Sequence, residues 1–115
     1  MSVRIDCEGK TILHVKNATF RFLYDNVTAA IDKRKIFLPE NLRHLIEKLE
    51  LGGYGIGCDI ADFIKDKKDA ELFASIIKQA IVSYKAEFPT LTEDIKEGVD
   101  NFYQELLKYA EELKN

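Results

Sequence analysis

The chain has no tryptophan and only two cysteines, two histidines and two prolines among its 115 residues. Cys7 and Cys58 lie far apart and do not make the disulfide framework of a small secreted domain, so we expect two reduced thiols. No run of eighteen apolar residues is present, which argues against a transmembrane helix, and the N-terminus has no apolar segment typical of a signal peptide. These absences predict a cytoplasmic protein with no membrane partner.

The motifs of nucleotide-binding and metal-binding proteins are also missing. Segment 52–63, GGYGIGCDIADF, holds four of the six glycines, but its spacing differs from the G-x-G-x-x-G of dinucleotide-binding proteins. Gly9-Lys10-Thr11 resembles the end of a mononucleotide loop, but Arg4 stands where that motif needs its first glycine. Neither an EF-hand pattern nor the paired cysteine and histidine spacing of a zinc site occurs. We therefore expect no cofactor and no metal ion.

The composition is that of one small folded domain. Hydrophobic residues make up 46% and charged residues 32% of the chain, which argues against a disordered segment. No linker or low-complexity tract divides the sequence, so we expect a single domain over residues 1–115. The net charge of −3 disfavours nucleic acid as a partner, and the basic run at residues 33–35 is interpreted as a solvated loop.

Two short segments at the N-terminus have the alternating pattern of strands. Apolar and polar residues alternate over residues 3–7 and again over 11–16, and a turn containing Gly9 separates them. This pattern predicts a β-hairpin with one buried face. In its second strand Leu13 and Val15 are expected on one face and Ile12 on the other.

Residues 17–35 fit two patterns. Aromatic residues alternate from Phe20 to Tyr24, which would suit a third strand. Apolar residues at helical spacing, however, continue from Phe20 to Ile31. Because the helical period persists where the alternation stops, we predict a helix that ends at the basic run 33–35, with Asn17 as its N-cap.

The rest of the chain reads as helices with short links. Pro39 marks a helix start and Gly52 the end of that helix. Asp59 is placed to cap a short helix, and Lys68 or Asp69 is expected to begin the next one, which is the most apolar.

The last predicted helix follows the second proline and runs to the C-terminus. Its start matches a capping box, Thr90-Leu-Thr-Glu93. The whole pattern predicts an α+β fold, mainly α, in which an N-terminal hairpin precedes four or five helices packed as an irregular bundle.

The glycine-rich segment is interpreted mainly as a joint between helices that keeps a contact surface. Exposed Tyr54 would suit partner binding, because aromatic residues on glycine-rich loops make good contacts. The spacing of Asp59, Asp62 and Asp66 would place three carboxylates on one helix face. Cys58 next to Asp59 offers a weaker alternative as a nucleophile, since the neighbouring carboxylate raises the pKa of the thiol.

The C-terminal quarter is the acidic part of the chain. Residues 89–115 hold three lysines and seven acidic residues, a net charge of −4. An ordinary solvated helix face explains this pattern, and so does a docking surface for a basic protein. For the second interpretation the candidate contact residues are Glu97, Asp100 and Glu105.

These features favour a binding protein over an enzyme. We expect a small acidic, bacterial-type protein of the immunity or antitoxin kind, which neutralises a basic toxin domain, such as a nuclease, by direct binding. One alternative is a small enzyme that uses Cys58 with Asp59 or Asp62. The other is a helical oligomeric regulatory module, because the apolar residues Phe102, Tyr103 and 106–107 exceed what one helix face needs.

Overall fold

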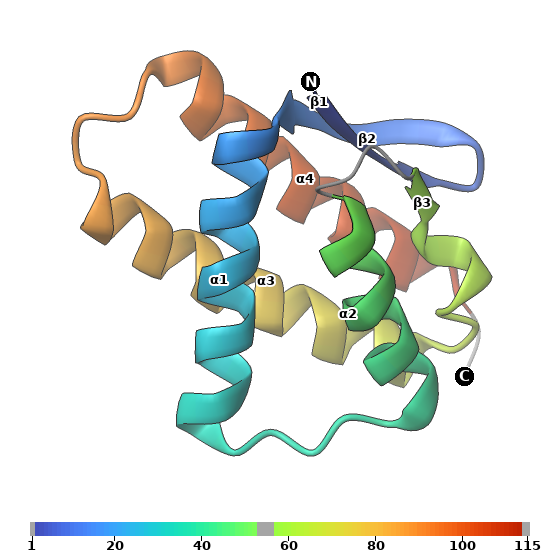
Figure 1. Cartoon of the computed structure of the whole chain (residues 1–115). Helices are drawn as coiled ribbons and strands as arrows, with labels where there is room; N and C mark the ends of the chain where they lie inside the picture. The colour runs from blue at the N-terminus through green and yellow to red at the C-terminus, as the bar shows by residue number, and fades with distance from the viewer. Residues whose placement is uncertain (1, 53–56, 114–115) are drawn as a thin grey trace.

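A computed structural model describes residues 2–52 and 57–113 of the protein, which is mainly helical with a small N-terminal sheet (Figure 1). Strands β1 (Ser2–Cys7) and β2 (Lys10–Lys16) form an antiparallel hairpin. The described part then contains helices α1 (Asn17–Arg34), α2 (Glu40–Gly52), α3 (Lys67–Glu87) and α4 (Glu93–Glu112). Strand β3 (Cys58–Asp59) and the 3-10 helix η1 (Ile60–Asp62) lie between α2 and α3. The predicted α+β architecture, a hairpin followed by helices, is confirmed.

The hairpin turns on two residues with left-handed backbone conformations. Glu8 has a φ of 53° and Gly9 a φ of 82°, and positive φ at both central residues is the mark of a type I′ turn, whose twist matches that of the paired strands. The register between β1 and β2 shifts by one residue here. Ile5 pairs with Leu13, but the next residue, Asp6, pairs with Thr11. Ile12 is the extra residue of this β-bulge and is buried like Leu13. The prediction that Ile12 lies on the opposite face was wrong, because a bulge breaks the strict alternation of sides.

Residues 17–34 form a helix rather than a third strand, as the longer apolar period predicted. Phe20, Leu23, Val27 and Ala30 make its buried stripe. The N-cap prediction was off by one residue, because Lys16 holds that position without a side-chain hydrogen bond.

The other helix boundaries follow the local signals, with two corrections. Helix α2 begins directly after Pro39, as predicted. Helix α3 begins at Lys67 rather than at 68 or 69, because the carboxylate of Asp66 accepts the N–H of Asp69 and caps the first turn. Helix α4 is capped by Thr92, so the capping box assigned to Thr90 was wrong.

A third strand joins the sheet from a distant part of the chain. β3 pairs in parallel with β1, with Cys58 beside Ile5 and Asp59 beside Asp6, and the strand order is β2-β1-β3. This strand was not predicted from the sequence, because two residues are too few to show alternation.

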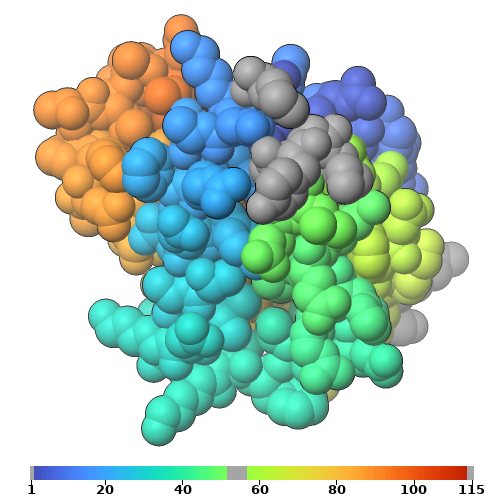
Figure 2. Space-filling model, viewed as in Figure 1, coloured from blue at the N-terminus to red at the C-terminus, as the bar shows by residue number. Residues whose placement is uncertain are grey.

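One core lies between the sheet and the helices. Helix α4 packs against β2 and α3, and α1 packs against α3 and both strands of the hairpin. Helix α3 contributes the largest share of buried side chains, as its wide apolar stripe predicted: Ala70, Phe73, Ala74, Ile76, Ile77, Ala80, Ile81 and Tyr84. In the space-filling view α1 and α2 form one outer face, and the connection between them lies at the lower end of the molecule (Figure 2).

Candidate functional site

Asp59 joins the hairpin turn to the start of η1. Its Oδ1 accepts the backbone N–H of Glu8 at 3.0 Å and that of Ala61 at 2.9 Å, and its Oδ2 accepts the N–H of Gly9 at 2.9 Å. The predicted cap at Asp59 is therefore confirmed for η1. The same carboxylate also binds both N–H groups of a turn that lies 50 residues earlier, which makes Asp59 a tertiary anchor.

The surroundings of Asp59 act on its pKa in opposite directions. Partial burial disfavours the charged form, but the three backbone N–H donors and the nearby charge of Lys65 favour it. The donors prevail, so the pKa of Asp59 lies below its ordinary value. Asp59 is consequently ionised at neutral pH, and its carboxylate is occupied by hydrogen bonds within the fold.

Glu105 holds the other side of the same turn. The carboxylate of Glu105, on α4, lies 3.3 Å from Nζ of Lys10 and 3.4 Å from Nζ of Lys108. The hydrogen bond from Lys10 is the main cause that lowers the pKa of Glu105. Two of the predicted partner-binding acids, Asp59 and Glu105, thus clamp the hairpin turn from two different elements.

A hollow of about 370 Å³ lies between the hairpin turn and the C-terminal half of α4. Tyr109 lines it, and its hydroxyl donates a 2.7 Å hydrogen bond to the buried carbonyl oxygen of Ile64. The carboxylates of Glu8 and Glu112 also line the hollow and make no ion pair within the described part of the chain. Three carboxylates and two ammonium groups meet here: Glu8, Glu105, Glu112, Lys10 and Lys108.

The other predicted acids near the glycine-rich segment do not share a helix face. Asp59 lies on β3, Asp62 ends η1 and is exposed, and Asp66 caps α3. The expected face was wrong because these residues belong to a strand, a 3-10 helix and the cap of a separate α-helix instead of one continuous helix. Tyr54 lies outside the described residues.

The exposed side of α4 is strongly acidic. Its exposed positions comprise six carboxylates, two amides and a single lysine: Glu93, Asp94, Glu97, Asp100, Asn101, Gln104, Lys108, Glu111 and Glu112. Two of these carboxylates have cationic neighbours, since Asp100 pairs with Lys85 at 2.7 Å and Glu93 with Lys96 at 3.5 Å. Glu97 makes no ion pair with any described residue. We call these nine exposed residues the acidic α4 face.

Both thiols are buried and resist ionisation. Burial raises the pKa of Cys58 to about 11 and, together with the charge of Asp59, that of Cys7 to about 12. Cys58 is 6% exposed. A nucleophilic cysteine needs an accessible thiolate, so these surroundings disfavour the alternative in which Cys58 is catalytic.

The apolar residues that suggested an oligomer are used within the fold. Phe102 and Leu106 are buried, and Tyr103 and Leu107 are half-buried and packed against the core. The pattern on which the oligomeric alternative rested is therefore explained by packing within one chain.

The described residues contain neither a metal-binding cluster nor a membrane-spanning helix. Within residues 2–52 and 57–113, no group of three or more histidine, cysteine or acidic side chains is placed to hold a metal ion. No helix in the same ranges has the length and apolar character needed to cross a membrane.

Sequence reasoning missed the part that the hairpin plays in this region. Lys10 and Glu8 face α4 across the hollow, although Lys10 and Glu105 are 95 positions apart. No spacing rule connects residues at that separation, so only the tertiary structure shows the contact.

Comparisons with known proteins give no relative for this arrangement. No protein-family model matches the chain, and searches of curated proteins and of solved structures find no significant match.

Proposed function

We propose that this protein is a non-enzymatic binding domain that covers a basic surface of another protein with its acidic α4 face. The observation that carries the proposal is the charge of that face, where six exposed carboxylates stand against one exposed lysine. Charge complementarity of this kind accelerates association and rejects partners of the wrong sign.

The acidic face lies on a helix whose other side is packed into the core. Val99, Phe102, Leu106 and Ala110 are buried on the opposite side of α4, and the helix packs against both α3 and β2. A face held in this way loses little conformational freedom on binding, which favours affinity. The hollow beside the hairpin turn adds one further carboxylate, from Glu8, which lines it together with Glu112 of the acidic face, and the two can receive a lysine or arginine side chain.

The class of partner that fits best is a basic toxin domain. Proteins that act on nucleic acids carry concentrated positive charge around their active sites, and an acidic helix face can occupy such a surface and exclude the substrate. We therefore propose a protein of the immunity or antitoxin kind that acts in a bacterial cytoplasm. The burial and the high pKa of Cys58 argue against the alternative in which this thiol is a nucleophile.

The test is co-expression of this chain with the product of the gene next to its own. We expect the two proteins to copurify and the chain to restore growth to cells that produce the neighbouring product. Failure to copurify together with failure to protect growth would reject the proposal.

A further inference from the structure

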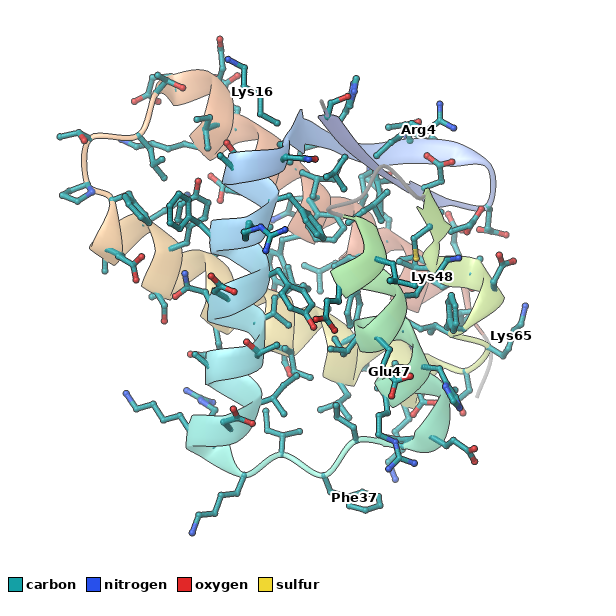
Figure 3. All side chains as sticks on the ribbon, in the orientation of Figure 1. Arg4, Lys16, Phe37, Glu47, Lys48 and Lys65 are labelled. Carbon is teal, nitrogen blue, oxygen red and sulfur yellow. The ribbon has the colours of Figure 1, made fainter. Side chains whose placement is uncertain are left out.

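A second surface of opposite character lies at the connection between α1 and α2. Phe37 is 87% exposed there, and Figure 3 shows its ring pointing away from the ribbon. Lys33, Arg34 and Lys35 precede it and Arg43 follows on the first turns of α2, and all four are exposed. We call these five residues the basic Phe37 surface.

The backbone around Phe37 is fixed by its neighbours. Lys35 adopts a left-handed conformation, with φ 52°, and ends α1 with its N–H directed at the carbonyl oxygens of Asp32 and Ile31. The N–H of Ile36 also bonds to the oxygen of Ile31, at 3.1 Å. Ile36 and Leu38, on either side of Phe37, are half-buried and packed against the core. The aromatic ring is thus held outward while its two apolar neighbours point inward.

None of the four cationic side chains of this surface makes an ion pair with a described residue. Lys33 and Arg34 lie in the last turn of α1, where positive charge complements the helix dipole. The four exposed cations outnumber the two flanking acids, Asp32 and Glu40, so the surface around the protruding ring is locally basic in a chain with net charge −3. Arg and Phe are also among the residue types enriched at protein interfaces.

We propose that the basic Phe37 surface binds an acidic protein segment that also carries an apolar side chain. The carboxylates of such a segment would pair with Lys33, Lys35 and Arg43, and its apolar side chain would cover the ring of Phe37. This inference is independent of the acidic α4 face, which would bind a partner of opposite charge.

A protein segment fits this surface better than a membrane or a nucleic acid does. Only one apolar side chain protrudes, and acidic residues flank the cations on both sides, Asp32 on α1 and Glu40 on α2. A flat anionic membrane would meet these acids together with the cations, whereas a peptide can place its carboxylates beside the cations alone. A single-stranded nucleic acid needs several aromatic platforms for stacking.

The probe is a fluorescein-labelled twelve-residue peptide of aspartate and glutamate with two central leucines, titrated with the full chain at low salt and followed by anisotropy. We expect saturable binding. Phe37→Ser should weaken it by at least about fivefold, because serine removes the ring that the leucine side chains of the peptide would cover. Lys35→Gln with Arg43→Gln should weaken binding by a similar factor. Lys65→Gln with Lys68→Gln, which removes the same charge from exposed sites elsewhere, should leave binding unchanged.

Three results would overturn the proposal. The first is absence of binding by wild-type protein whose circular dichroism shows it folded. The second is evidence that net charge alone attracts the peptide. This evidence would be either equal weakening by the Lys35/Arg43 and Lys65/Lys68 substitutions, or equal affinity for peptides with and without leucines. The third is tighter binding to phosphatidylserine vesicles or to single-stranded DNA than to the peptide.

Discussion

The backbone N–H of Gly9 donates a 2.9 Å hydrogen bond to Oδ2 of Asp59, across 50 positions of sequence. With the bond from Glu8 to Oδ1, it ties the hairpin turn to the strand that follows the glycine-rich segment. One carboxylate therefore connects the hairpin turn, β3 and the first turn of η1.

Replacing Asp59 should destabilise the whole domain. Asp59→Ala removes the acceptor for three backbone N–H groups, and we expect a loss of about 2–3 kcal/mol in the free energy of unfolding, measured by urea denaturation. Asp62→Ala changes an exposed acid three residues away and should cost less than about 0.5 kcal/mol. Equal effects of the two substitutions would show that the bonds to the turn contribute nothing.

The same carboxylate predicts a loss of stability in acid. The pKa of Asp59 is lowered in the folded protein from an ordinary value of 3.8. Its contribution is therefore present above pH 3.8 and disappears as the pH falls through the lower, folded-state pKa. Asp59→Asn has no charge to lose, so the stability gap between wild type and this variant should narrow as the pH is lowered from 6 to 3. A gap that stays constant or widens would contradict the assigned direction.

Two glycines should respond to alanine in opposite directions. Gly9 has a φ of 82°, and nothing lies within 4 Å of an added Cβ, so Gly9→Ala should destabilise by about 1–2 kcal/mol through backbone strain alone. Gly98 lies inside α4, again with open space around an added Cβ, and Gly98→Ala should stabilise by about 0.5–1 kcal/mol. Thermal melting of both variants measures the two changes in stability. A change of the same sign in both would contradict the backbone conformations described here.

The two thiols should be unreactive while the protein is folded. Cys7 is 8% and Cys58 6% exposed, and burial raises the pKa of both thiols well above 9. Ellman's reagent at pH 8 should therefore react with fewer than about one thiol in ten until urea unfolds the chain. Rapid reaction of Cys58 in the folded protein would revive the catalytic alternative.

Local signals in the sequence predicted most elements, because the residues that cause them are neighbours in the chain. The helical spacing from Phe20 to Ile31 and the glycine of the hairpin turn are signals of this kind. The bulge at Ile12 could not be foreseen, since it depends on how β2 pairs with β1. Strand β3 was not predicted for a related reason, because the strand with which it pairs lies more than fifty residues away in the sequence.

The candidate site was predictable in charge but not in geometry. The acid-rich composition of the last helix indicated an acidic face, and Glu97 and Asp100 are exposed on it. Glu105 was chosen by the same rule and Asp59 by its spacing to Asp62 and Asp66, but Asp59 binds the hairpin turn and Glu105 binds the residue that follows it. Composition cannot tell a carboxylate with partners in its own fold from one without them. The basic run 33–35 was interpreted as a solvated loop, but Lys33 and Arg34 belong to the last turn of α1. The exposure of Phe37 beside them shows only in the folded chain.

The central claim is that the acidic α4 face binds a basic protein, and the most direct measurement is the affinity for the product of the neighbouring gene. Biolayer interferometry at low salt would compare wild type with Glu97→Lys plus Glu111→Lys on α4. The matched control, Asp25→Lys plus Glu71→Lys, changes the net charge equally at exposed sites on α1 and α3. We predict that the α4 pair weakens binding by at least about tenfold and the control pair by less than about threefold. Equal effects of the two pairs, or no binding by wild type, would contradict the claim.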